Sequence, residues 1–300
     1  MRNGPFFSII IPTFNRADYL EKTLQSVLAQ TYSHYEVVIV DDGSTDSTVQ
    51  ILQKWLSPTV RYVYQENGER AKARNKGISM AKGDYITFVD SDDLFYPNHL
   101  ELAAKNISSY QFPLVYRQNY ELRTPNGQLQ CPPEILRSDP NIEILKGNFF
   151  SCIGVFIHKN VAAEQLFCED RRLSYTEDWE YWLRLSVRYK FYNCNVVTSC
   201  MIDHSDRSSY QFDKKKMRML SALLLFNLKK DKLFYATRGR YMNQIKANML
   251  SLMALMKVST GSNQDVFCYL KRAICLSPRE LIRRRSLAIL KHSLFNLAKA

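Results

Sequence analysis

Three short apolar runs, each followed by a helical pattern, constrain the fold of this 300-residue chain more than any other feature. The runs are Phe6–Ile11, Val37–Val40 and Tyr85–Val89, and each gives way to polar residues. After the first run, apolar residues recur at helical spacing from Leu20 to Leu28. Strands that alternate with helices in this way are typical of βαβ units. The sequence therefore predicts an α/β fold in which helices flank a mostly parallel sheet.

Acidic residues follow two of these runs, where each strand should end. Asp41-Asp42 follows the second run, and Asp90-Ser91-Asp92-Asp93 follows the last. Ligands of open α/β sheets bind beyond the carboxyl ends of the strands, so these side chains should converge on one cleft. Crowded carboxylates suit Mn²⁺ or Mg²⁺, which bind through one or two carboxylates and the phosphates of a substrate. The alternative is a solvated acidic turn that caps the next helix.

The residues around these strand ends resemble the family 2 glycosyltransferases, which have the GT-A (Rossmann-like) fold, are mostly inverting and use nucleotide-diphospho-sugars. The resemblance covers about the first two thirds of the chain, and nothing from about Asp213 onward can be assigned to the family. The segments that carry it are Ile10–Arg16, Val40–Asp46, Ala73–Gly77, Gly83–Asp93, Thr176–Glu180, and His204 with Ser208 and Ser209.

The resemblance implies a nucleotide-sugar donor, most simply a UDP-sugar, at the first strand ends. Phe14 would stack on the base, unless it is a core residue, and Asp42 would bond the base edge. Asp90 would reach the ribose. Arg70 and Arg74 would run beside the nucleotide, because guanidinium groups suit phosphates and base edges, although either could be a solvated helix charge. The full set implied for the donor is Pro12, Phe14, Asn15, Arg16, Asp42, Arg70, Arg74, Asp90 and Ser91.

The resemblance also implies a divalent metal, Mn²⁺ or Mg²⁺, with Asp92 and His204 as its ligands. Such an ion offsets the negative charge that builds on the diphosphate as the sugar leaves. His204 could instead be structural. The polar residues around it form a loop that could close over the donor, and they are Asp203, Ser205, Arg207 and Ser208. Asp93 is expected to cap a helical segment from Leu94 to Leu102.

Inversion requires a base that takes the proton of the attacking hydroxyl. By the resemblance this base is Asp178, with Glu177 and Trp179 as its neighbours on the acceptor side. The alternative is that Glu177 and Asp178 only favour a helix N-terminus, where the macrodipole stabilises negative charge.

The segment between Asp93 and Glu177 is harder to interpret. Tyr116–Leu122 and the turn Thr124–Gly127 predict a hairpin region rich in loops, where the family recruits its acceptor. The run Gly154–Ile157 predicts that the sheet then resumes.

Positive charge is concentrated at the C-terminus. The chain carries a net charge of +12, but residues 214–300 hold 19 Lys and Arg against 3 Asp and Glu. Apolar residues between these charges indicate helices, so we divide the chain into a GT-A domain (1–212) and a basic helical region (213–300). Basic amphipathic helices bind anionic membranes with about 1 kcal/mol per well-placed charge. A helical bundle with solvated basic faces explains the same pattern.

The composition indicates an enzyme of the cytoplasm, either free or peripheral on the cytoplasmic face of the membrane. The seven cysteines are widely spaced and suggest reduced thiols. The first residues lack the pattern of a signal peptide. No apolar stretch approaches the roughly 20 residues that span a bilayer.

We predict an inverting, metal-dependent glycosyltransferase that transfers a sugar to a hydroxyl of a glycan or lipid-linked glycan, in surface polysaccharide biosynthesis. One alternative is a sugar-nucleotide nucleotidyltransferase, but this class carries a glycine-rich phosphate loop and Pro12–Arg16 contains no Gly. A polyanion or nucleic-acid-binding protein would explain the basic tail and leave the acidic strand ends unexplained. We expect no nucleic-acid partner.

Overall fold

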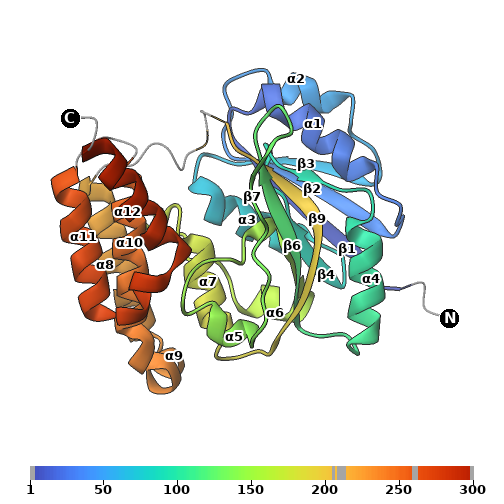
Figure 1. Ribbon diagram of the computed structural model, residues 1–300. Coiled ribbons are helices and arrows are strands. Elements are labelled where there is room, and N and C mark those ends of the chain that lie inside the picture. Colours follow the sequence, from blue (N-terminus) through green and yellow to red (C-terminus); the bar gives the residue numbers. More distant parts are fainter. Residues whose placement is uncertain (1–3, 205–206, 208–213, 259–262, 298–300) are drawn as a thin grey trace.

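A nine-stranded sheet flanked by helices forms the centre of the protein, and further helices pack against one side of it (Figure 1). The computed structural model describes residues 4–204, 207, 214–258 and 263–297. The strands are β1 Phe7–Thr13, β2 Tyr35–Asp41, β3 Val60–Tyr64, β4 Tyr85–Phe88, β5 Leu94–Phe95, β6 Val115–Arg123, β7 Leu129–Cys131, β8 Val155–His158 and β9 Phe191–Ile202. The α-helices are α1 Ala17–Leu28, α2 Thr48–Gln53, α3 Glu69–Met80, α4 His99–Ser109, α5 Pro140–Glu143, α6 Lys159–Glu164, α7 Glu177–Leu185, α8 Lys214–Lys230, α9 Lys232–Arg238, α10 Met242–Val258, α11 Asn263–Leu276 and α12 Arg284–Leu297.

The first four strands are parallel, in the order β3-β2-β1-β4, and form the part of the fold that the sequence predicts best. Every residue of β1 is buried, because helices cover both faces of the sheet. Ile9 packs in one apolar cluster with Leu24 of α1, and Ile10 packs in the other with Ala73 of α3. A Cβ at Gly77 of α3 would lie only 2.4 Å from Cγ2 of Ile10, so glycine allows α3 to approach the sheet closely.

The sheet as a whole is mixed, which corrects the prediction of a mostly parallel sheet. Strand β8 lies antiparallel between β4 and β6, and β5 lies antiparallel beside β9. Strand β9 is parallel to β6, so the second half of the sheet contains both parallel and antiparallel pairs. The hairpin of β6 and β7 and the return of the sheet at β8 are as predicted.

The segment after Asp93 differs from its prediction. Leu94–Phe95 is the short strand β5, and the next helix begins at His99. The Asp93 carboxylate is buried and accepts hydrogen bonds from the backbone N–H of Ile202 (3.1 Å) and from Arg207 (3.0 Å). Asp93 therefore joins β5 to the end of β9 and does not cap a helix.

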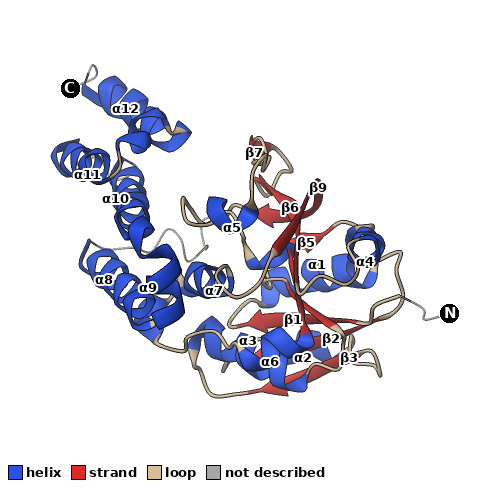
Figure 2. Ribbon diagram, turned by 90° about the horizontal axis from the view of Figure 1, so that it is seen from below, coloured by secondary structure: helices blue, strands red, loops and turns tan. Residues whose placement is uncertain are grey.

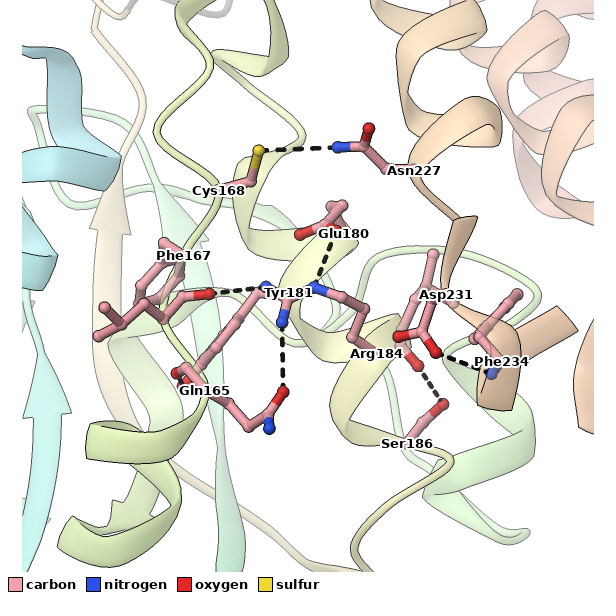
Figure 3. Close-up of polar contacts among 12 residues, drawn as sticks. Gln165, Phe167, Cys168, Glu180, Tyr181, Arg184, Ser186, Asn227, Asp231 and Phe234 are labelled. Atoms are coloured by element: carbon pink, nitrogen blue, oxygen red, sulfur yellow. Dashed lines mark hydrogen bonds and ion pairs between the residues drawn. The ribbon is translucent and has the colours of Figure 1, made fainter. Parts of the chain in front are cut away.

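The C-terminal helices share a core with the sheet domain, and α7 lies between the sheet and α8 (Figures 1 and 2). Leu224 of α8 belongs to the same buried cluster as Trp182 of α7. A polar contact also joins α8 to the loop that follows α6, since Nδ2 of Asn227 donates to Sγ of Cys168 at 3.6 Å (Figure 3). The carboxylate of Asp231 caps α9 at the N–H of Phe234 (3.0 Å) and pairs with Arg188 at 2.8 Å.

The outer surface of these helices mixes apolar and basic side chains. Leu281, Ile282 and Leu287 are 48%, 77% and 53% exposed, and the neighbouring Arg279 and Lys291 are exposed too. Within the described part of the chain, no helix has both the length and the apolar character needed to cross a bilayer.

Candidate active site

A cavity of about 680 Å³ opens at the carboxyl ends of β1, β2 and β4, and α7 and α8 close it on the opposite side. This is the edge of the sheet where the sequence predicts the ligand. The structure brings twelve of the fourteen predicted site residues to this cavity. They are Pro12, Phe14, Asn15, Arg16, Asp42, Arg70, Arg74, Asp90, Ser91, Asp92, Glu177 and Asp178.

The two adjacent aspartates at the end of β2 make different contacts. Asp41 is fully buried and accepts hydrogen bonds from the N–H of Ser44 (2.8 Å) and the hydroxyl of Tyr62 (3.0 Å). Asp42 lines the cavity, and the N–H of Gly68 donates to its carboxylate at 2.8 Å. The loop conformation thus depends on Asp41, while Asp42 is fixed at the rim.

The turn after β1 is fixed to the turn after β2, which orders one wall of the cavity. Asn15 accepts a hydrogen bond from the N–H of Thr45 (2.8 Å) and donates its own N–H to Ser44 (3.0 Å). Phe14 is 46% exposed and lines the cavity, so it is not the core residue that the sequence left as an alternative. Its ring is accessible for stacking on a flat ligand.

Arg74 connects the two sides of the site. Its guanidinium is buried and reaches the carboxylates of Asp90 (2.8 Å) and Glu177 (3.0 Å). Arg70 lies 3.8 Å from the same Glu177 carboxylate. Burial alone would raise the pKa of Asp90, but Arg74 and Arg70 outweigh it and hold this pKa below its usual value. Neither arginine is the solvated helix charge that the sequence left possible.

Asp92 and His204 lie against each other beside the cavity. Nε2 of His204 is 3.1 Å from Oδ2 of Asp92, and the His204 ring stacks on Tyr19 with 4.4 Å between centroids. Arg16 approaches the same carboxylate at 3.6 Å. His204 is buried behind Asp92 and does not line the cavity itself. Ser205 and Ser208 of the predicted polar loop lie outside the described residues, as does Ser209, which helps to carry the family resemblance.

Asp178 faces the cavity from the first turn of α7 and is half-buried. The side-chain amide of Asn148 donates to its Oδ2 at 3.0 Å, and the N–H of Trp179 donates to Oδ1 at 2.7 Å. Burial and the neighbouring carboxylate of Glu177 raise the pKa of Asp178 to about 7, against the opposing effect of Arg74. A carboxylate tuned to this range is suited to exchange protons near neutral pH.

Trp179 is the predicted site residue that the structure places elsewhere. Its side chain is 2% exposed, and its indole N–H donates to the carbonyl of Ile144 at 2.9 Å. Residue 179 lies one position after Asp178 on α7, so its side chain points away from the cavity into the core.

Several cavity residues escaped the sequence analysis. Met217, Leu220 and Leu252 reach it from α8 and α10, and nothing in the sequence indicates that distant helices return to the site. Tyr175 also lines the cavity and has a backbone φ of 89°. Glu69, which was also missed, and the predicted residue Asn15 have φ values of 71° and 49°. Strained backbone of this kind clusters at functional sites.

Comparison with known proteins identifies the family of this chain. The sequence profile of Glycosyl transferase family 2 matches residues 8–156. TuaG of Bacillus subtilis (strain 168), a glycosyltransferase assigned to teichuronic acid biosynthesis, is 33% identical over 207 residues, which cover 67% of this chain and 79% of TuaG. The chain belongs to the family 2 glycosyltransferases. An uncharacterized glycosyltransferase of Rickettsia bellii (strain RML369-C) is 32% identical over 215 residues, 68% of this chain, but the match spans only 31% of that longer protein.

Solved structures confirm the GT-A type of fold that the sequence predicts. S. aureus TarS 1-349 in complex with UDP-GlcNAc aligns with a TM-score of 0.68 and 19% identity, over 97% of this chain and 89% of that one. Mannosyltransferase PcManGT from Pyrobaculum calidifontis, in complex with GDP-Man and Mn²⁺, aligns with a TM-score of 0.56 and 17% identity, over 98% of this chain and 87% of that one. At these identities the likeness concerns the fold.

Proposed function

We propose that this family 2 protein is an inverting glycosyltransferase that moves a sugar from a nucleotide-diphospho-sugar, a UDP-sugar, to a hydroxyl of a glycan. One observation carries the proposal: a single cavity has Asp42, Asp90 and Asp92 on one wall and Asp178, with a pKa of about 7, on the other. The UDP-GlcNAc bound to the similarly folded TarS supports the choice of donor.

The donor nucleotide would occupy the strand-end wall of the cavity. Phe14 would stack on the base and Asp42 would accept a hydrogen bond from its edge. Pro12, Asn15, Arg16 and Ser91 would complete the contacts of the nucleotide. Asp90 would bond the ribose, while Arg70 and Arg74 would supply positive charge near the diphosphate.

Asp178 would act as the base from the opposite wall. The acceptor hydroxyl attacks the anomeric carbon on the side away from the diphosphate, and its proton passes to the Asp178 carboxylate. The attack forms the new glycosidic bond, breaks the bond to the phosphate and releases the nucleoside diphosphate. Glu177 would keep Arg74 in place, because its buried carboxylate is already paired with that guanidinium.

A divalent metal fits the residues beside Asp92. One carboxylate and one imidazole lie 3.1 Å apart, and the Nδ1 atom of buried His204 has no hydrogen-bond partner within the described structure. The described residues contain no cluster of three or more metal-ligating side chains, but Mn²⁺ and Mg²⁺ often bind through few protein ligands and the substrate phosphates. Asp92 and His204 would hold the ion, which would supply electrostatic stabilisation of the leaving diphosphate.

The acceptor would be a growing surface glycan or its lipid-linked precursor, as the biosynthetic assignment of TuaG suggests. The exposed basic and apolar residues around Ile282 would then hold the enzyme at the cytoplasmic face of an anionic membrane. Vesicle sedimentation with and without anionic lipid tests this association, and equal binding to neutral vesicles would contradict it.

The activity is tested by release of UDP from a panel of UDP-sugars, with Mn²⁺ and a mixture of glycan acceptors. Asp178→Asn should abolish transfer and leave the Kd for UDP within about twofold, since the base is not a donor ligand. Asp18→Asn, an exposed carboxylate of α1, is the matched control and should behave as wild type. Transfer that survives in Asp178→Asn would refute the role of the base.

The metal is tested separately. Asp92→Ala should weaken UDP binding in Mn²⁺ and change it little in chelator, and activity that persists unchanged in chelator would remove the metal from the mechanism.

A nucleotidyltransferase would instead form a UDP-sugar from UTP and a sugar phosphate with release of pyrophosphate, which the same protein should not do.

A further inference from the structure

Two residues of the C-terminal region donate hydrogen bonds to one backbone carbonyl near the candidate base, that of Lys146. Nδ2 of Asn248, on α10, donates to this oxygen at 2.5 Å. Nη1 of Arg283, which follows the 3₁₀ helix η5 (Pro278–Ile282), donates to the same oxygen at 2.5 Å. These donors lie 102 and 137 residues along the chain from Lys146. Two segments of the basic region therefore converge on one atom of the sheet domain.

We call Asn248 and Arg283, with the Lys146 carbonyl that they both contact, the clamp. Lys146 lies two residues before Asn148, which contacts the candidate base. Asn148 donates its side-chain amide to Oδ2 of Asp178 at 3.0 Å. Between them, Gly147 has no side chain, and a Cβ there would lie 3.1 Å from Nδ2 of Asn248. Glycine thus allows α10 to approach this segment closely. The position of Lys146 then limits where the amide of Asn148 can point.

The arginine of this clamp is itself held in place by a buried acid. Glu280 is fully buried, and its Oε1 lies 2.9 Å from Nη1 of Arg283. The same Oε1 accepts a hydrogen bond from Gln244 of α10 at 3.0 Å. Only 3 acidic residues occur in 214–300, among 19 basic ones. A buried ion pair adds little net stability, so its more evident effect is to fix the direction of Arg283.

We propose that Asn248 and Arg283 are positioning residues for the proposed glycosyl transfer: they fix the Lys146 carbonyl and thereby hold the amide of Asn148 against the carboxylate of Asp178. The inference rests on Asp178 being the base. It assigns the region after residue 213, where the family resemblance ends, a part in the chemical step.

The physical effect follows from the hydrogen bond at the base. An amide N–H that donates to a carboxylate stabilises its ionised form, so loss of this contact favours protonation. Among the described residues, the other charged or titratable groups with the largest influence on Asp178 are Glu177 on the same helix, Arg74 on α3 and the buried thiol of Cys152. None of these contacts the clamp, so a change at Arg283 should reach Asp178 through Asn148.

The first test compares Arg283→Met and Asn248→Ala with Arg272→Met, which removes an exposed charge from α11. A misplacement of about 1 Å can cost about 100-fold in rate, so a smaller displacement of the base should cost about tenfold. We expect both clamp variants to lower kcat by about that factor, with the KM for the donor within twofold. The acid limb of the pH profile should move to higher pH, and Arg283→Lys should restore part of the loss.

A double-mutant cycle tests whether Arg283 acts on Asp178 through Asn148. In an Asn148→Ala background, Arg283→Met should change kcat less than twofold, because the contact through which it acts is already absent. Equal effects of Arg283→Met in both backgrounds, or a fall in donor affinity with an unchanged pH profile, would overturn the inference. Asn248→Ala leaves the pair of Arg283 and Glu280 intact, so it keeps the test decisive if Arg283→Met does not fold.

A measurement without substrate separates this inference from the proposed function. Carboxyl ¹³C NMR of aspartate-labelled protein follows the titration of Asp178, assigned by its absence in Asp178→Asn. The titration midpoint should rise in Arg283→Met and stay unchanged in Arg272→Met. If this midpoint rises in Arg283→Met but Asp178→Asn still transfers sugar normally, the clamp is supported and the role of Asp178 as base is refuted. An unchanged midpoint in Arg283→Met would refute the clamp.

Discussion

Replacing Arg74 should destabilise the protein more than any other single change at the site. Arg74 and Glu177 have side chains that are only 3% and 4% exposed, and they pair at 3.0 Å. Arg74→Met leaves Glu177 buried without its main partner, which typically costs about 3–5 kcal/mol. Asp90 loses less, because its side chain is 31% exposed and can turn to water. Arg70, 3.8 Å from Glu177, compensates in part, so we expect about 3 kcal/mol, the lower end of this range.

A substitution of Glu177, the partner of Arg74, separates the contribution of their ion pair from other effects of replacing Arg74. Glu177→Gln removes the charge that Arg74 balances while Arg74 keeps Asp90, and we expect a cost of about 1–2 kcal/mol. The double variant leaves no unpaired buried carboxylate at residue 177, so its cost should fall at least about 1 kcal/mol short of the sum of the single costs.

Urea unfolding followed by tryptophan fluorescence measures these values, because Trp179 and Trp182 are buried in α7 beside Glu177. Arg172→Met, at an exposed arginine in η2 (Arg171–Leu173), is the control and should remain near wild type. The reasoning is refuted if Arg74→Met lies within about 0.5 kcal/mol of wild type, or if the two single effects simply add.

Four further predictions concern pH and packing. Since the base must be ionised and the pKa of Asp178 is raised to about 7, kcat/KM should fall below pH 7, and a profile flat down to pH 5 would contradict this assignment. The raised pKa means that folded protein binds more protons than unfolded protein between about pH 4 and 7, so wild type should lose stability relative to Asp178→Asn as pH rises through that window, as thermal unfolding would show. Gly77→Ala should cost about 1–3 kcal/mol because its Cβ would lie 2.4 Å from Ile10, whereas Gly239→Ala meets only ordinary contacts and serves as control. Asp231→Asn should cost less than Asp231→Ala by about 1 kcal/mol, because Asn keeps the cap of α9; equal costs in urea unfolding would show that the cap contributes nothing.

The N-terminal half of the fold can be predicted from the sequence because the patterns that indicate it involve neighbouring residues. The run Phe6–Ile11 is apolar without interruption, since β1 is covered on both faces, and such a run forms a strand wherever it lies in the chain. The acidic residues at the ends of β2 and β4 follow from the same logic, because parallel strands bring their carboxyl ends to one edge. Asp42 and Asp92 were found in this way.

Other features depend on contacts that no local pattern encodes. The direction of β8, which is antiparallel to both β4 and β6, is set by pairing with strands distant in sequence, whereas the sequence analysis predicts a mostly parallel sheet. Trp179 and Asp178 are adjacent in sequence, yet the turn of α7 sends one into the core and the other to the cavity. Which of the two could meet a substrate was decided by how α7 packs.

The sequence by itself determined the α/β class, the carboxylates at the strand ends and the excess positive charge after residue 213. Only the tertiary structure decided that Arg74 pairs with Glu177 across the site, that α8 and α10 line the cavity, and that Arg283 reaches the loop beside Asp178. The physical reason is the sequence separation of the interactions: hydrophobic periodicity and the acidic residues at strand ends are patterns of a few neighbouring residues. Burial and the electrostatic environment of a side chain are set by residues far away in the sequence, as Arg74 and Glu177 show at a separation of 103 residues.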